Sequence, residues 1–504
     1  MLRVAFYLAL SVASTWPLAW RLASHYPRGA EPVATVPLAS AWALWWTSDR
    51  AAHGFVDYWH APIFWPVQDA FALSEPMPLL GLLAAPVLWL GLPLVLAYNL
   101  VLLAMLTANG VFAERLLRGL RVSPAWAGGA LVCVLPGLHH ELGVLTLVPL
   151  AGVLACLHYA FAIVRTGRGG VGLGVAFAAT YLCCAQYALL LALALLPFLR
   201  WRRSFAVAAL IASVTLAPIV VAQQRAVQAH QLVRSEQRVR DGSARLGDYA
   251  IAPPALLPPP VHVDRGSNTA LYPGTLHLVL AVIGASWALR RRRRTAVLLL
   301  SFAAITFVLS ISPRLVLAGH SLHAALAAVV PGLAQVRSIW RAGLFVQLAL
   351  ALFAAFGLHA LQRRRYLTIA IGLALLEVWP RAQHLTAAPD EAAYARWAAF
   401  MRQSPGEPYC LLPFANNGYV RAFEQTAQLM TLTRLHQRPM LNGYSSYFPE
   451  PHEQLWRAPP KLGDASSAAR LRARGVRQVV SSDDALWPVL FRDDATGIRV
   501  YAVP

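Results

Sequence analysis

Charged residues are scarce in this chain. Only 13% of its 504 residues are charged, whereas 58% are hydrophobic. A typical soluble domain carries about 25% charged and about 45–50% apolar residues. The composition therefore excludes an ordinary water-soluble protein. It predicts a multi-pass α-helical membrane protein, because apolar runs near the roughly 20 residues that one crossing needs recur along the chain.

Lysine and cysteine are also rare. Lys461 is the only lysine among 43 basic side chains, and the arginines cluster between apolar runs. The formal charge of +20 therefore indicates membrane topology, and we expect no nucleic-acid partner. Of the five cysteines, four lie inside apolar stretches and Cys410 stands alone in the polar tail. This arrangement excludes a disulfide framework and a cysteine-rich metal site.

Several catalytic motifs are missing from the sequence. It has no glycine-rich phosphate loop, no Gly-x-Ser-x-Gly nucleophile turn and no His-Glu-x-x-His motif. ATP-driven transport and serine or zinc hydrolysis therefore have no support. Proton-coupled transport would need acids in the middle of spans, and only Glu377 lies inside an apolar run, near its end.

Long apolar runs dominate the first 380 residues. We predict about eleven transmembrane helices in this region, domain 1–380, followed by a domain at 381–504. The predicted spans are approximately 4–20, 95–114, 125–138, 143–163, 170–184, 186–199, 204–222, 274–289, 295–311, 341–361 and 366–380.

Arginine clusters predict the orientation of these spans. With a cytoplasmic N-terminus, every cluster follows an even-numbered span and lies on the cytoplasmic face, as the positive-inside rule requires. The outer face then receives loops 21–94, 223–273 and 312–340 and the tail. The clusters are Arg115, Arg118 and Arg121; Arg165 and Arg168; Arg200, Arg202 and Arg203; Arg290 to Arg294; and Arg363 to Arg365.

Three segments allow a second interpretation. Residues 79–92 would reverse every later cluster if they crossed, so we predict an interfacial or re-entrant helix there. Residues 170–199 fit two spans or a hairpin that dips from the outer side. The first span resembles a signal peptide cleaved near Ser24, but Trp16 and Trp20 suit the end of a retained interfacial helix better.

The tail has an ordinary charge balance. Residues 381–504 carry 14 basic and 11 acidic side chains, against 29 and 12 in residues 1–380. We predict a small α/β domain on the periplasmic side. Its expected elements are a helix from Asp390 to about Arg402, a strand at 409–414, a helix and strand within 466–482, and a strand at 498–503.

The first outer loop gathers acids among aromatic rings. Carboxylates accept hydrogen bonds from sugar hydroxyls, and rings stack on the apolar faces of sugars. Tryptophans and tyrosines also form interfacial belts on membrane proteins, so both interpretations stay open. The candidates are Glu31, Asp49, Asp57, His60, Asp69 and Glu75, interleaved with Trp42, Trp45, Trp46, Tyr58, Trp59 and Trp65.

A possible cation site follows the third span. His139, His140 and Glu141 are residue types that ligate divalent metals, but three consecutive residues at a helix end point in different directions. Capping or interfacial solvation is the alternative role. His320 and His323, three apart, are an equally weak pair. The sequence therefore leaves a divalent metal open and requires no cofactor.

Two arginines flank Trp340 where the tenth span begins. Arg337 and Arg341 at this membrane mouth suit a lipid phosphate, which guanidinium groups bind through paired hydrogen bonds. Snorkelling toward lipid headgroups is the alternative.

Three passages carry a resemblance to a known family. Residues 57–103, DYWHAPIFWPVQDAFALSEPMPLLGLLAAPVLWLGLPLVLAYNLVLL, resemble the amino-terminal region of bacterial membrane proteins of the GT-C glycosyltransferase superfamily. VRSIWRAGLFVQLALALFAAFGL, at 336–358, resembles the late-span signature of YfhO-type members. RLHQRPMLNGYSSYFPE and LRARGVRQVV in the tail resemble their periplasmic domain. The likeness covers nearly the whole chain.

The resemblance implies an inverting hexosyl or pentosyl transferase of the bacterial inner membrane. It would move a sugar from a polyprenyl-phosphate donor to a glycan or lipid acceptor of the cell envelope, on the outer face. Glu31 stands where similar proteins carry an aspartate before proline, which implies the base that deprotonates the acceptor. Arg337, Arg341 or a bound cation would neutralise the phosphate, and Asp57, His60 and Glu75 would organise the donor mouth.

Two other functions compete with the transferase. Glutamate in place of aspartate moves the carboxylate by over an ångström, which favours a non-catalytic protein that binds a lipid-linked glycan or a partner on the same scaffold. A lipid or small-molecule transporter ranks third, because few charges lie in mid-membrane.

Overall fold

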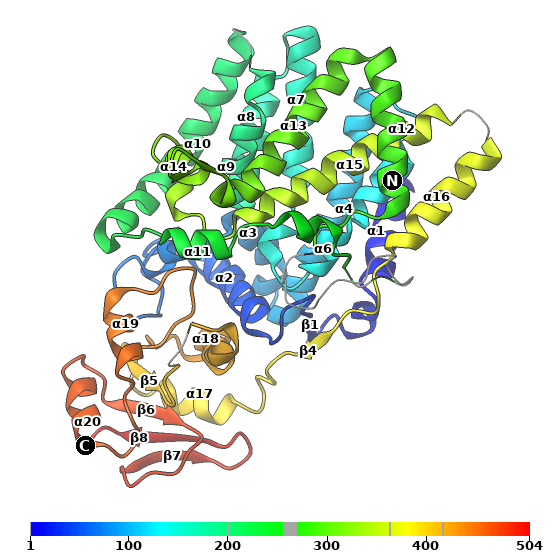
Figure 1. Cartoon of the computed structure of the whole chain (residues 1–504). Coiled ribbons are helices and arrows are strands. Elements are labelled where there is room, and N and C mark those ends of the chain that lie inside the picture. The colour runs from blue at the N-terminus through cyan, green and yellow to red at the C-terminus, as the bar shows by residue number, and fades with distance from the viewer. Residues whose placement is uncertain (1, 200–201, 254, 256–269, 362–363, 416–417) are drawn as a thin grey trace. The chain divides into compact units, whose positions relative to one another are not determined.

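A computed structural model describes residues 2–199, 202–253, 255, 270–361, 364–415 and 418–504 (Figure 1). Arg200 and Arg363, and with them part of two predicted cytoplasmic clusters, lie outside the described residues. The chain divides into two compact units. Unit 1 comprises Met1–Arg21, Leu100–Pro218 and Val233–His384, and unit 2 comprises Leu22–Asn99, Ile219–Leu232 and Leu385–Pro504.

Unit 1 is helical, and five stretches in the described part of the chain are long and apolar enough to cross a membrane. They are Leu94–Gly119, Leu145–Thr166, Arg203–His230, Arg293–Arg314 and Ile339–Ala360. The multi-pass prediction is therefore confirmed, while the number eleven stays a prediction. The main helices are α1 (Leu2–Ser14), α4 (Leu94–Gly119), α5 (Ala125–Cys133), α6 (Pro136–His140), α7 (Ala151–Thr166), α8 (Gly170–Cys183), α9 (Ala185–Ala194), α10 (Arg203–His230), α12 (Thr275–Arg291), α13 (Arg293–Ile311), α15 (Ala342–Ala360) and α16 (Arg364–Val378).

Helix α15 lies in the core of unit 1, where it packs against α12 (Figure 1). The two backbones touch at glycines. A Cβ on Gly284 would lie 2.0 Å from the carbonyl oxygen of Phe353, and one on Gly357 would lie 2.1 Å from that of Leu280. Small residues let helices approach closely where lipid supplies no hydrophobic driving force. These glycines therefore set the distance between α12 and α15.

Prolines shorten two of the predicted spans. The expected helix at 125–138 breaks into α5 and α6, and Pro136 begins the second piece. The first helix ends at Ser14, and a separate 3₁₀ turn follows from Leu18 to Arg21. Pro17, which lies between them, has no backbone N–H to continue the helix.

Unit 2 brings the first outer loop and the tail into one compact body. Helices α2 (Thr35–Ala52) and α3 (Pro78–Trp89) come from the loop. The tail supplies α17 (Ala395–Met401), α18 (Glu424–His436), α19 (Glu450–Arg457) and α20 (Ala465–Arg472). It also supplies strands β5 (Tyr409–Leu411), β6 (Gln478–Ser481), β7 (Val489–Asp493) and β8 (Ile498–Ala502), which form one sheet in the order β5-β6-β8-β7.

The tail sheet agrees with the predicted small α/β domain. β5 pairs in parallel with β6, and the other two pairings are antiparallel. One predicted boundary is wrong: the helix expected from Asp390 begins at Ala395. The carboxylate of Asp390 instead accepts a hydrogen bond from the backbone N–H of Ala392 in a preceding turn. Aspartate favours such local turns as well as helix starts, and here the turn prevails.

Helix α3 covers most of the segment at 79–92 that was predicted to be an interfacial or re-entrant helix, and its place in the membrane stays a prediction. Its 12 residues extend about 18 Å, against roughly 30 Å of hydrocarbon. One side packs on α2, where a Cβ on Gly81 would lie 2.4 Å from the Cβ of Thr47. The other side leaves Leu82, Leu83 and Trp89 41%, 46% and 58% exposed. A short helix with one apolar exposed face suits the bilayer surface.

Candidate functional site

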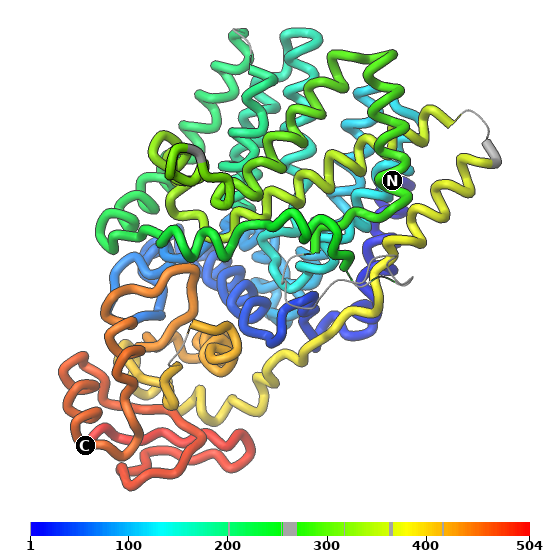
Figure 2. The backbone as a smooth tube through the Cα atoms, in the orientation of Figure 1, coloured from blue at the N-terminus to red at the C-terminus, as the bar shows by residue number. Residues whose placement is uncertain are grey.

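Glu31 lies in a short loop of unit 2 that is held on both sides by the tail. Before the loop, strand β1 (His25–Pro27) pairs antiparallel with β4 (Leu385–Ala387), and Tyr26 lies opposite Thr386. Figure 2 shows these two stretches of backbone running side by side. A strand partner from the far end of the chain therefore fixes where the loop begins.

The other end of the loop is fixed by helix α18 and the turn before it. The backbone N–H of Ala34 donates to Oε1 of Glu424 at 2.9 Å. The hydroxyl of Thr35 donates to the carbonyl oxygen of Val420 at 2.8 Å. Ala34 immediately precedes α2, so its N–H has no acceptor within that helix and needs one from outside. We call these two contacts and the β1–β4 pairing the tail clamp.

The neighbourhood of Glu31 contains two buried tyrosines. Glu31 is half-buried, and its charge acts on Tyr98, whose ring packs edge-on against Tyr26 at 5.2 Å between centroids. Burial raises the pKa of Tyr26, and the positive charge of Arg434 opposes this rise. Nε of Arg434 in turn donates to the carboxylate of Glu391 at 2.9 Å. Glu31 therefore acts electrostatically on a buried pair of aromatic rings, which also feels the charge of Arg434 from the tail.

The residues of the same loop that were predicted to organise the donor site lie at or near the surface of unit 2. Asp57 is exposed with a φ of 54°, in the left-handed region that favours glycine. His60 is also exposed, and its Nδ1 lies 3.4 Å from a carboxylate oxygen of Asp69. Glu75 is half-buried shortly before α3. These side chains are available to a ligand, but each already has a local conformation or partner of its own.

The tryptophans of α2 are packed inside unit 2. Trp42, Trp45 and Trp46 are only 2%, 8% and 6% exposed. The indole N–H of Trp46 donates to the carbonyl oxygen of Tyr58 at 2.8 Å, and that of Trp42 donates to the hydroxyl of Thr433 at 3.3 Å. All three rings are buried, and the N–H groups of Trp42 and Trp46 have acceptors within unit 2, as in a protein core. Neither an interfacial belt nor a sugar platform describes these three residues.

Arg341 immediately precedes helix α15 in unit 1, and Gln186 holds its side chain. One guanidinium N–H donates to Oε1 of Gln186 at 2.7 Å, and the amide of Gln186 donates to the carbonyl oxygen of Ser338 at 2.7 Å. Gln186, 7% exposed, lies in the first turn of α9. A guanidinium so oriented at the positive end of a 19-residue helix suits an anion. Arg337, four residues earlier, is exposed.

The predicted cation ligands lie in and after α6. His139 is 4% exposed, and burial lowers its pKa to about 4. Nε2 of His140 lies 3.9 Å from a carboxylate oxygen of Glu141. Across the described ranges, no three His, Cys, Asp or Glu side chains come together as a metal site would require. A metal held by His139, His140 and Glu141 stays a prediction.

The predicted residues thus fall into two local groups. Glu31, Asp57, His60 and Glu75 belong to unit 2, whereas Arg337, Arg341 and the His139–Glu141 segment belong to unit 1. Sequence reasoning missed Gln186 and Glu424 as positioning residues. Gln186 had a signal, as a polar residue in an apolar run, but Glu424 had none, because its partner Ala34 is 390 residues away.

Comparisons with known proteins place the fold. No protein-family model matches the sequence, and no curated protein matches it either. Among solved structures, the chain is similar to the arabinofuranosyltransferase AftD from Mycobacteria, with a TM-score of 0.56 and 16% identity. The match covers 99% of this chain and 41% of that one, so this chain spans less than half the length of AftD. The likeness shows that the chain shares its fold with that part of AftD.

Proposed function

We propose that this protein is a membrane glycosyltransferase that moves a sugar from a polyprenyl-phosphate donor to an acceptor on the outer face of the inner membrane. The observation that carries the proposal is the fold, which AftD shares along 99% of this chain. The apolar helices support a site that meets a lipid-linked donor within the bilayer.

In the proposed reaction, an acceptor hydroxyl oxygen attacks the anomeric carbon of the donor sugar. Its proton passes to the carboxylate of Glu31. The bond between the anomeric carbon and the phosphate oxygen breaks, and the electron pair leaves with the lipid phosphate. The product has the opposite anomeric configuration. Arg341, oriented by Gln186, and Arg337 would stabilise the departing phosphate.

The tail clamp supports the role given to Glu31. A general base must stay within hydrogen-bond reach of the proton it accepts, and a shift of 1 Å can lower the rate about a hundredfold. A loop held by strand pairing before Glu31 and by Glu424 and Val420 after it meets this need. A loop that only carried an interfacial residue would not require such support.

The test is transfer from a radiolabelled polyprenyl-phosphate sugar in membranes that contain the protein. Glu31→Gln should lower turnover at least about a hundredfold, because the amide cannot accept the proton. Glu31→Asp should keep measurable activity. The matched control is Glu450→Gln, a 59% exposed carboxylate of the tail, which should leave turnover unchanged.

Undiminished turnover in Glu31→Gln would remove Glu31 from the mechanism. The non-catalytic function would gain support if the wild-type protein showed no turnover and yet a lipid-linked glycan co-purified with it, as mass spectrometry of extracted lipids would reveal. In that case the protein would bind the lipid-linked glycan without transferring its sugar.

A further inference from the structure

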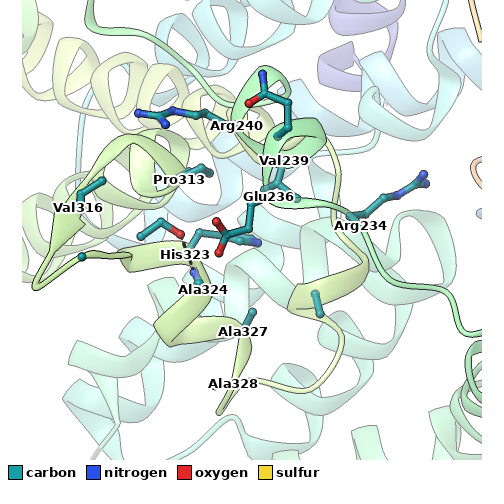
Figure 3. A pocket seen from close by; sticks show the side chains of 14 residues that line it. Arg234, Glu236, Val239, Arg240, Pro313, Val316, His323, Ala324, Ala327 and Ala328 are labelled. Atoms are coloured by element: carbon teal, nitrogen blue, oxygen red, sulfur yellow. Dashed lines mark hydrogen bonds between the residues drawn. The ribbon is translucent and has the colours of Figure 1, made fainter.

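A separate pocket lies within unit 1, between two segments of the predicted outer loops. Its volume is about 480 Å³, and its walls come from residues 234–240 and 313–334 (Figure 3). Pockets of roughly 300–1,000 Å³ are typical of small-molecule sites. The pocket includes none of the residues assigned above to transfer, so it needs an explanation of its own.

A histidine and a glutamate meet in the middle of this pocket (Figure 3). His323, in helix α14 (Leu322–Ala327), is only 6% exposed. Among the described residues its Nδ1 has no hydrogen-bond partner. The carboxylate of Glu236, in helix α11 (Glu236–Asp241), acts on it electrostatically. A buried polar atom normally has a hydrogen-bond partner. The unpaired Nδ1 of His323 therefore indicates that the pocket binds a ligand with a polar group.

The imidazole is neutral near pH 7. Burial lowers the pKa of His323, and the negative charge of Glu236 opposes this shift only in part. The pocket therefore offers a neutral ring that can donate or accept, beside a carboxylate that only accepts. A hydroxyl group matches this pair, since it can donate to Glu236 and accept from His323 at the same time.

The remaining walls narrow the class of ligand. Ala324, Ala327 and Ala328 lie three and four residues apart and form a smooth apolar side. The guanidinium groups of Arg234 and Arg240 also border the pocket but extend away from the central pair (Figure 3). A phosphate beside the central pair would face the charge of Glu236, which disfavours an anion there. The described residues also lack the third ligand that a metal ion would need.

We propose that this pocket binds one or two sugar units of the glycan acceptor, with a hydroxyl held between Glu236 and His323. The inference rests on the proposed glycosyltransferase function and names the acceptor as a neutral carbohydrate. The volume of about 480 Å³ accommodates a mono- or disaccharide. The alanine wall contacts the apolar face of the sugar, and the arginines at the rim remain available to substituents outside the pocket.

Saturation-transfer NMR on the full-length protein in lipid nanodiscs tests this proposal. The probes are neutral methyl glycosides of hexopyranoses and pentofuranoses and their disaccharides. At least one probe should receive saturation from the wild-type protein, and His323→Ala and Glu236→Gln should each reduce that signal at least fivefold. His320→Ala is the matched control, because His320 is exposed, lies three residues away and does not line the pocket.

Three results would overturn the proposal. They are the absence of signal from every neutral probe, a signal that persists in both pocket variants, and displacement of a bound probe by inorganic phosphate, which would indicate an anion site. Glu236 is exposed, so Glu236→Gln should fold normally and keeps the test valid if His323→Ala does not fold. Gel filtration and circular dichroism check both variants.

Glu31→Gln separates this inference from the proposed function. If the sugar still binds to Glu31→Gln while transfer stops, both proposals stand. If His323→Ala and Glu236→Gln weaken sugar binding but Glu31→Gln does not change transfer, the pocket proposal stands and the role of Glu31 falls. If transfer depends on Glu31 but no neutral sugar binds, the function stands and the acceptor pocket falls.

Discussion

The carboxylate of Glu377 caps the start of helix α12 at Thr275. Its Oε1 accepts from the backbone N–H of Thr275 at 2.6 Å, and its Oε2 accepts from that of Leu276 at 2.8 Å. This acid lies inside an apolar run, where a residue for proton-coupled transport would be expected. Its engagement at a helix N-terminus, where negative charge is favourable, gives it a structural role instead.

Glu377→Ala should therefore lower the stability of unit 1. Loss of an anionic cap costs about 1 kcal/mol, so thermal unfolding in detergent should shift to lower temperature by a few degrees. Glu377→Gln should recover part of the loss, because its amide oxygen accepts one of the two hydrogen bonds. An unchanged midpoint for Glu377→Ala would show that the cap does not stabilise α12.

Glu424→Ala should reduce glycosyl transfer although Glu424 belongs to the tail. The substitution removes the acceptor for the N–H of Ala34 and loosens the loop that holds Glu31. We expect the rate of transfer to fall about tenfold, which is less than the roughly hundredfold loss that a 1 Å displacement of a catalytic group can cause. The assay is the same transfer reaction, with Glu450→Ala as control. Full activity would mean that the tail clamp does not position the loop.

Substitution of Arg341 or Gln186 should weaken binding of the polyprenyl-phosphate sugar and leave binding of the sugar acceptor unchanged. Arg341→Ala removes a charged donor for the lipid phosphate and should raise the KM for the polyprenyl-phosphate sugar about tenfold. Gln186→Ala should raise it less, because it only frees the guanidinium from its 2.7 Å contact. Varying the donor concentration at fixed acceptor measures both. A change confined to the acceptor KM would contradict the phosphate role.

The tail should lose stability in acid. Nδ1 of His436 accepts from the backbone N–H of Arg438 at 3.0 Å, so the folded ring is neutral. Burial, followed by the charges of Arg438 and Arg402, lowers the pKa of His436 to about 3. In the unfolded chain the pKa is about 6.5. Between these values the unfolded state binds more protons, so the free energy of unfolding falls as the pH drops.

This group alone should contribute a slope of about 1.4 kcal/mol per pH unit inside that window. Hydrogen exchange of the tail amides, measured from pH 7 to pH 4 and corrected for the intrinsic exchange rate, gives the slope. His436→Gln should flatten it even if the variant is less stable at pH 7. An equal slope in wild type and variant would assign the acid sensitivity to another residue, such as His452, whose pKa burial also lowers to about 3.

Cysteine labelling tests the predicted orientation. All five native cysteines are buried, so they should react little with an impermeant maleimide. Leu486→Cys, at a fully exposed position of the tail, should be labelled in intact cells if the tail is periplasmic. Arg168→Cys, in a predicted cytoplasmic loop, should be labelled only after permeabilisation. The reverse pattern would invert the topology.

The membrane character and the tail sheet could be predicted from local patterns. Val479 and Val480 belong to a short β-branched run, and arginine clusters alternate with apolar stretches. Helix starts were less predictable, because Asp390 satisfies a turn as readily as a helix. The sequence left Trp42 and Trp46 as either an interfacial belt or a platform for sugar rings. Only their burial against other segments of unit 2 argues against both roles.

The support of Glu31 could not be predicted. Ala34 and Glu424 are joined by one hydrogen bond across 390 residues, and nothing near either residue indicates the other. Contacts of this kind depend on the tertiary path of the chain. The same holds for His323: its sequence neighbour His320 suggested a weak metal pair, whereas the structure places it beside Glu236.

The pairing of Tyr26 with Thr386 has a consequence for the order of events during biosynthesis. The loop with Glu31 leaves the ribosome long before the strand and helix that hold it. A nascent chain therefore cannot fix this loop until β4 and α18 have been made and have reached the same side of the membrane. Premature termination anywhere before β4 would leave the loop without the strand and the helix that hold it.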